Sequence, residues 1–101
     1  MIEVRQTDVF KAWFAGLRDR KARARIAIRI QRPERGNPGD VKSVGSGVSE
    51  MWIDYGPGYR MYFAGRGKTV VILLCGGDKS SQAADIKRAQ QLWSEWKRRQ
   101  S

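Results

Sequence analysis

The stretch Val48–Lys79, VSEMWIDYGPGYRMYFAGRGKTVVILLCGGDK, decides the fold of this chain. It contains three runs rich in β-branched and aromatic residues, separated by glycine and proline. Runs of this kind, bounded by turn residues, predict adjacent strands joined by tight hairpins. The expected strands are 48–55, 59–64 and 69–75, and the expected turns are Gly56-Pro57-Gly58 and Gly65-Arg66-Gly67.

Alternation along the second of these strands separates two sets of side chains. Tyr59, Met61 and Phe63 point to one face of the sheet, and Arg60 and Tyr62 point to the other. If Met61 and Phe63 pack on helices, Arg60 lies on the open face of the sheet. The sequence therefore predicts a platform with an apolar face and a cationic face.

Two segments flanking this platform show helical periodicity. Either Thr7 or Asp8 can cap the first helix, and either Ser80 or Ser81 can cap the last, which is expected over 80–99. Apolar residues in both segments recur at spacings of three and four, which is one face of a helix. These residues are Phe10, Trp13, Phe14 and Leu17 in the first segment, and Ile86, Ala89, Trp93 and Trp96 in the last.

The segment 18–35 is rich in arginine, and its apolar period is ambiguous. Ala24, Ile26, Ile28 and Ile30 alternate as in a strand. Ala22, Ile26 and Ile30 also form a helical stripe. Because alanine and arginine favour helices, we expect a second helix, antiparallel to the first.

The remaining segments are short. Residues 1–5 can form an edge strand, and the loop 33–40 is rich in proline, glycine and asparagine. Residues 41–47 form an extended lead-in that places Lys42 just ahead of the sheet. We expect one α+β domain over residues 1–101, since a chain of 101 residues holds one modest core.

Composition excludes several kinds of site. The chain has no histidine, so it has no imidazole acid or base and no ordinary zinc site, and we expect no metal and no cofactor. Cys75 is the one cysteine, and we expect it to be a buried strand residue. No apolar run has the length of a membrane span and no apolar signal segment follows Met1, so we expect a cytoplasmic protein.

Charge is the most informative bulk property. The formal net charge is +10, from 20 basic and 10 acidic residues. This excess favours a polyanionic partner such as nucleic acid, or an acidic protein that neutralises it. A solvated basic surface with no such partner is the alternative.

The cations nearest the predicted platform can act on RNA without a metal. When a 2′-OH attacks its own phosphate, negative charge grows on phosphoryl oxygens that an arginine can clamp. A lysine can move the proton, and aromatic side chains can stack on splayed bases. The alternative is that these residues only bind phosphate or keep the protein soluble. They are Lys42, Arg60, Arg66 and Lys79, with Tyr55, Tyr59 and Tyr62 nearby in sequence.

Three motifs carry a resemblance to a known family. They are GNPGDVKSVGSGVSE (36–50), DYGPGYRMYF (54–63) and LLCGGDKSSQAADIKRA (73–89). With them the chain resembles the RelE/ParE superfamily of toxins from toxin–antitoxin modules, in its HigB-like, phage-derived addiction module killer branch. The resemblance implies a β-α-α-β-β-β-α fold, with a helical hairpin on a small antiparallel sheet and a C-terminal helix. It also implies that the ambiguous segment is helical.

The resemblance further implies an endonuclease that cuts mRNA on the ribosome and is silenced by an antitoxin. That antitoxin is expected to carry a helix-turn-helix domain and to form a heterotetramer with the toxin. Arg60 matches the arginine of the GYR motif, the phosphate clamp, and Lys79 matches the basic residue after the last strand. These two are the expected catalytic residues. The expected RNA-binding residues are Lys42, Trp52, Tyr55, Tyr59 and Arg66.

The sequence departs from the family pattern at Trp52, where this branch commonly has arginine. Trp52 either stacks on a base, or lies at a position without a catalytic role, or lowers activity. The tail also lacks the tyrosine or histidine that some members use as acid or base. Two other functions therefore stay open: a ParE-like toxin that poisons DNA gyrase, and a degenerate toxin that only binds RNA and antitoxin.

Overall fold

The computed structural model describes residues 3–31 and 41–100, and it is an α+β fold, as the sequence predicts. The predicted loop 33–40 lies outside the described residues. The strands are β1 (Glu3–Gln6), β2 (Val41–Gly45), β3 (Val48–Ile53), β4 (Tyr59–Arg66) and β5 (Val70–Gly77). The helices are α1 (Asp8–Ala15), α2 (Arg20–Gln31), the 3₁₀ turn η3 (Lys79–Ser81) and α3 (Gln82–Gln100).

The sheet is mixed, and this corrects the expectation of an antiparallel sheet. Its strand order is β1-β5-β4-β3-β2. β1 runs parallel to β5, whereas the other neighbouring strands are antiparallel. Parallel partners cannot be joined by a hairpin, so this pairing between strands far apart in sequence leaves no local sequence signal.

β2 is a strand that the sequence did not predict. The segment expected to be an extended lead-in pairs with β3, so Lys42 lies opposite Glu50. The pairing shifts between Ser43 and Gly45, so Val41 and Val44 do not alternate as strand residues usually do. The element order is therefore β-α-α-β-β-β-β-α, with one strand more than predicted.

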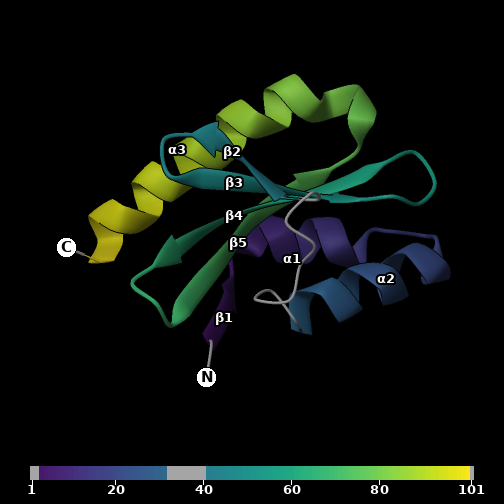
Figure 1. Ribbon diagram of the computed structural model, residues 1–101, viewed down its shortest axis with the longest axis horizontal. Coiled ribbons are helices and arrows are strands. Elements are labelled where there is room, and N and C mark those ends of the chain that lie inside the picture. Colours follow the sequence, from purple (N-terminus) through teal and green to yellow (C-terminus); the bar gives the residue numbers. More distant parts are fainter. Residues whose placement is uncertain (1–2, 32–40, 101) are drawn as a thin grey trace.

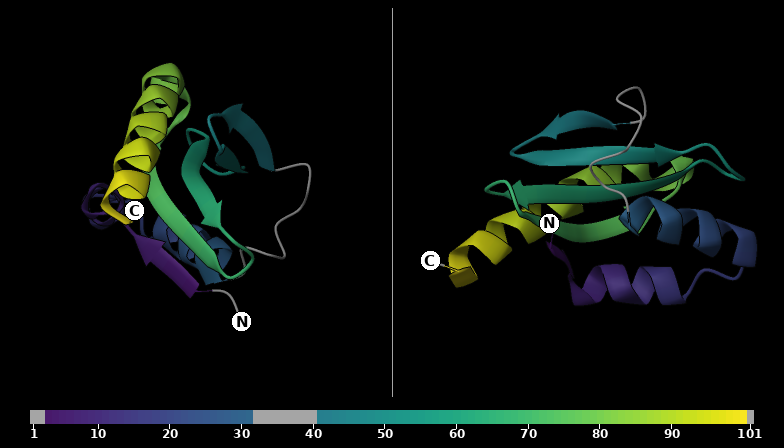
Figure 2. Two further views of the ribbon diagram at one scale, coloured as in Figure 1. Left: turned by 90° about the vertical axis from the view of Figure 1, so that its left-hand side faces the viewer. Right: turned by 60° about the horizontal axis from the view of Figure 1, so that its bottom comes forward.

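Helices cover both faces of the sheet (Figure 1), and the two further views in Figure 2 show the same layers. One core lies between the sheet and α1 and α2, and it includes Phe10, Ile26 and Met61. The other lies under α3, where Tyr62 and Ala64 of β4 pack with Trp93. The expectation of an open face was wrong, because α3 crosses the face to which Arg60 belongs.

The ambiguous segment is a helix, as expected. Ala22 and Ile26 are fully buried, and Ile30 packs at the edge of the same core. Ile28 is 55% exposed, which the alternating strand pattern would not allow. Burial of the helical stripe against the core thus explains why this segment is a helix and not a strand.

Capping residues are partly as predicted. The Thr7 hydroxyl accepts a hydrogen bond from the Phe10 N–H and begins α1. Before α3, Asp78 caps the 3₁₀ turn η3, and its side chain accepts from the Ser80 N–H at 2.8 Å. Ser81, one of the two predicted caps of the last helix, directly precedes α3, and its hydroxyl donates to Asp85 at 2.5 Å. Asp78 thereby fixes the turn that carries Lys79.

The pair Gly76-Gly77 is required by close packing on both faces of β5. A Cβ on Gly76 would lie 2.4 Å from the Trp13 ring of α1. One on Gly77 would collide with the Asp85 carboxylate of α3. The pair is therefore part of a strand held between two helices.

Among the described residues, no helix is long and apolar enough to cross a membrane. Cys75 is buried in β5, as predicted.

Candidate functional site

Three predicted site residues converge on the turn between β3 and β4. Trp52 lies directly opposite Arg60 in the β3–β4 ladder. A Cβ built on Gly58 would lie 3.5 Å from the Trp52 indole nitrogen, 3.6 Å from Arg60 Nη1 and 3.9 Å from Lys79 Cβ. We call Trp52, Arg60 and Lys79 the Gly58 cluster. Figure 1 shows this turn and the start of α3 at the same end of the sheet.

Arg60 is the most enclosed member of the Gly58 cluster. Only 14% of its side chain is exposed. Its Nη1 donates a hydrogen bond of 2.9 Å to the Gly58 carbonyl, and its Nε lies 3.7 Å from Glu50 Oε1. The guanidinium is thus held in place at the sheet surface.

Glu50 is a buried carboxylate beside the Gly58 cluster, and the sequence did not predict its role. It is 3% exposed. Its Oε1 lies 3.7 Å from both Lys42 Nζ and Arg60 Nε. Its Oε2 accepts hydrogen bonds of 2.9 Å from the Tyr62 hydroxyl and the Gln82 amide. The available signal was alternation, which places Glu50 on the same face as the buried Val48.

Tyr62 supports this carboxylate as a neutral donor. Its ring is fully buried under α3. Burial, and after it the hydrogen bond to Glu50, raises the pKa of Tyr62 above its ordinary value of 10.0. The hydroxyl therefore keeps its proton and donates a hydrogen bond to Glu50.

Lys79 is exposed, and its position comes from the cap below it. The Asp78 carboxylate accepts from the side chain of Ser80 at 2.5 Å and from its N–H at 2.8 Å. These two hydrogen bonds hold the pKa of Asp78 below its usual range. The backbone of Lys79 is thus fixed by the turn, and its side chain is exposed.

Tyr55 and Tyr59 do not join the Gly58 cluster, although they are close to it in sequence. Both pack against the core on the α1 and α2 side. The Tyr55 hydroxyl donates to Asp19 at 3.1 Å, and the Tyr59 ring meets Trp13 edge-on at 6.4 Å. Their expected RNA-binding role therefore loses its geometric basis.

Arg66 is also remote from the Gly58 cluster. It pairs with Val70 at one end of the β4–β5 ladder, whereas Arg60 pairs with Gly77 at the other end. The predicted second turn lies later than expected, at 67–69, because β4 continues through Arg66. The two arginines are six steps apart along the strand, which separates them by about 20 Å.

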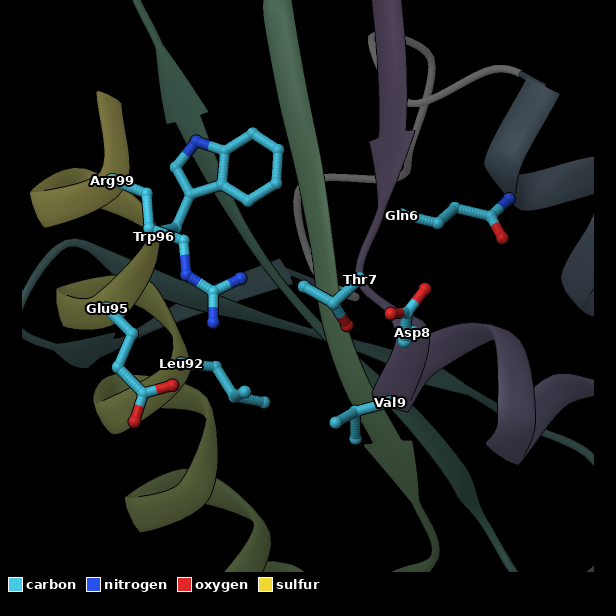
Figure 3. A pocket seen from close by; sticks show the side chains of 8 residues that line it. All are labelled: Gln6, Thr7, Asp8, Val9, Leu92, Glu95, Trp96 and Arg99. Atoms are coloured by element: carbon cyan, nitrogen blue, oxygen red, sulfur yellow. The ribbon is translucent and has the colours of Figure 1, made fainter.

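A groove of about 360 Å³ lies elsewhere, between α3 and the junction of β1 with α1. Figure 3 shows Leu92 and Trp96 of α3 facing Thr7 and Val9 across β5. No predicted site residue lines it. The Gly58 cluster is therefore the site in which the predicted cations meet.

Known proteins offer one informative comparison. The chain is 47% identical over 94 residues to an uncharacterized protein of Haemophilus influenzae, covering 93% of this chain and 95% of the relative. The chain belongs to the family of that protein. No protein-family model matches the chain. Family membership brings no activity with it, so function must be argued from the site.

The chemistry available at the Gly58 cluster is anion binding beside an aromatic surface. The guanidinium of Arg60 lies there, the side chain of Lys79 begins there, and Lys42 is linked to Arg60 through Glu50. Trp52 is 39% exposed, which leaves part of its indole open to a ligand. Arginine and lysine bind phosphate oxygens with charge-assisted hydrogen bonds, and an indole stacks on nucleobases.

Proposed function

We propose that this protein is the toxin of a type II toxin–antitoxin module and cleaves mRNA on the ribosome. The observation that carries the proposal is the convergence of Trp52, Arg60 and Lys79 within 4 Å of one point beside Gly58. This pairs a phosphate-binding cation with a base-stacking surface. The net charge of +10 adds a general attraction for RNA.

The resemblance of the GYR and GGDK motifs to the RelE/ParE superfamily supports the same conclusion. A helical hairpin on one face of the sheet and a C-terminal helix on the other are compatible with a RelE-like fold. The proposal extends to a cytoplasmic protein silenced by an antitoxin with a helix-turn-helix domain, in a heterotetramer. An acidic antitoxin segment would neutralise the basic surface.

The proposed reaction is attack of an RNA 2′-oxygen on the adjacent phosphorus. The bond from that oxygen to phosphorus forms, the bond to the 5′-oxygen breaks, and the proton of the 2′-OH passes to a water molecule. Arg60 binds the phosphoryl oxygens, where negative charge grows in the transition state. Lys79 is exposed beside it and can donate a proton to the departing 5′-oxygen. Trp52 stacks on a neighbouring base.

The test is cleavage of mRNA on programmed ribosomes by the purified protein, with cut sites mapped by primer extension. Wild-type protein is expected to cut, and Arg60→Ala to lower the rate by about 100-fold or more, because removing one oxyanion donor costs about that much. Arg99→Ala is the matched control, since Arg99 is exposed near the far end of α3. Intact mRNA with folded wild-type protein would refute the proposal, and DNA damage on induction would point to gyrase.

A degenerate toxin that binds without cutting is the second candidate, and Trp52 favours it. An indole lies opposite Arg60 where a second cation would strengthen the phosphate clamp. Tight RNA binding without cleavage, together with cleavage by Trp52→Arg, would establish this candidate in place of the first.

A further inference from the structure

Glu50 has an unusual place for a carboxylate in a cationic site. It is almost completely buried on the face of β3 that α3 covers. A buried charge is costly unless it is paired and hydrogen-bonded. Apolar residues at this position would fill the same space, so the carboxylate requires an explanation from its neighbours.

The two oxygens of Glu50 have different partners. Oε2 accepts two hydrogen bonds, both of 2.9 Å and both from neutral donors: Tyr62 of β4 and Gln82, the first residue of α3. These donors come from two separate elements of the fold. They therefore fix the plane of the carboxylate without neutralising its charge.

Oε1 faces the cations instead. Lys42 Nζ and Arg60 Nε each lie 3.7 Å from it. That distance gives electrostatic attraction, but it is longer than a hydrogen bond. Arg60 Nε is buried and makes no hydrogen bond within the described part of the chain. The carboxylate thus acts on both cations through its charge and not through a hydrogen bond.

We propose that Glu50 is the positioning residue of the Gly58 cluster, which holds the guanidinium of Arg60 in its phosphate-binding orientation. This inference rests on the proposed function. Glu50 acts through Arg60 and does not touch the RNA. The Gly58 carbonyl holds Nη1, and the Glu50 charge draws in Nε, so the orientation of the guanidinium is set before RNA arrives.

If Glu50 positions Arg60, substitution of Glu50 should lower kcat without weakening the affinity for RNA. Glu50→Gln keeps the size of the side chain and removes one negative charge close to the bound phosphate. Affinity for RNA should therefore stay equal or increase, whereas kcat should fall by about 100-fold because the clamp is misplaced. If Glu50 only stabilised the fold, its substitution would lower the apparent affinity for RNA and kcat together, because both would fall with the fraction of folded protein.

The experiment measures kcat on ribosome-bound mRNA, and Kd for an RNA that carries 2′-deoxy nucleotides and cannot be cut. Glu3→Gln is the matched control: it removes one carboxylate from an exposed ion pair on β1, the far edge strand. A kcat within threefold of wild type, or a Kd that weakens as much as kcat falls, would overturn the inference. If Glu50→Gln does not fold, Tyr62→Phe removes one donor to Oε2 and should lower kcat about tenfold at unchanged Kd; an unchanged kcat would overturn the inference.

A second readout needs no substrate. In the wild-type protein, NMR should show the Arg60 Nε–H exchanging slowly with water, because that atom is buried beside Glu50. Glu50→Gln should accelerate this exchange at least tenfold, and equal rates would overturn the inference. If the wild-type protein fails to cut mRNA, the proposed function falls, and this measurement still decides the role of Glu50.

Discussion

Trp52 of β3 and Arg60 of β4 are directly paired across the sheet, and both reach the space beside Gly58. Side chains paired in this way lie on the same face, at about 5 Å between their Cβ atoms. An aromatic surface and a guanidinium therefore stand next to each other at the end of the β3–β4 hairpin. In RNA each base likewise lies next to a phosphate, so the indole can stack on the base while the guanidinium binds the phosphate. Substitution of Trp52 tests this stacking role.

Trp52→Ala is expected to weaken RNA binding by about 10-fold to 100-fold, because stacking on one base contributes about 1–3 kcal/mol. Trp52→Phe should retain most of the affinity, since a phenyl ring also stacks. The measurement is fluorescence anisotropy with a labelled uncleavable RNA. Ile28→Ala, at the other large exposed apolar residue of the ranges 3–31 and 41–99, is the control and should bind as wild type does. Equal affinities for Trp52→Ala and Ile28→Ala would contradict the stacking role.

Trp52→Arg should add a second cation directly opposite Arg60. A further phosphate contact makes the logarithm of the affinity depend more steeply on the logarithm of salt, by about 0.7 for single-stranded RNA. Titrations between low and moderate salt measure this slope for wild type and variant. An unchanged slope would show that position 52 does not reach a phosphate.

Gly77→Ala is expected to destabilise the protein by about 1–3 kcal/mol or more, which is the usual cost of overpacking. The added methyl group would overlap the carboxylate of Asp85, which in turn accepts a hydrogen bond of 2.5 Å from Ser81. Gly65→Ala is the control within the same sheet, because the nearest atom to its Cβ would be 3.8 Å away. Urea unfolding measures the stability of both variants. Equal unfolding midpoints for Gly77→Ala and Gly65→Ala would contradict the packing described for β5.

Cys75 should resist alkylation in the native protein. Burial, with a smaller contribution from Asp85, raises the pKa of this thiol to about 12. At pH 8 the reactive thiolate is then scarcer by about 1,000-fold than for an ordinary cysteine, and access is also blocked. Mass spectrometry after iodoacetamide treatment, with and without guanidinium chloride, measures the difference. Rapid labelling of the native protein would contradict the burial of Cys75.

Local patterns predicted most of the elements, because each helix buries a stripe that is visible in the sequence. Ala89 and Trp93 of α3 are buried as their spacing indicates. What the pattern missed has two causes. β2 pairs with β3, its neighbour in sequence, but the irregular register removes the alternation that would have marked β2 as a strand. β1 pairs with β5, which is distant in sequence, and that pairing is not encoded within a short window.

The sequence predicted only part of the site, because some of its contacts depend on how distant elements pack together. Arg60 and Lys79 were chosen from motifs, and the structure brings them together with Trp52. Tyr59 was chosen because it is close in sequence to Arg60, but neighbouring residues of a strand point to opposite faces. Glu50 was overlooked because a charged strand residue ordinarily faces solvent. Only the placement of α3 and Gln82 shows that it is buried and held.

Asp78→Ala should lower stability by about 1 kcal/mol at pH 7, which is the usual value of a helix cap. The pKa of Asp78 is lowered from 3.8 by hydrogen bonds from Ser80, so its ionised form is favoured in the folded state. Its contribution is present above pH 3.8 and is lost as the pH falls through the lower folded value. The difference in unfolding free energy between wild type and Asp78→Ala should therefore shrink below pH 3.8, as measured by urea unfolding at several pH values.

Asp78→Asn is the control, because it keeps a capping oxygen that does not titrate. Its stability relative to Asp78→Ala should therefore be independent of pH. A wild-type advantage that persists undiminished at pH 2 would show that the cap on the Lys79 turn does not depend on the charge of Asp78.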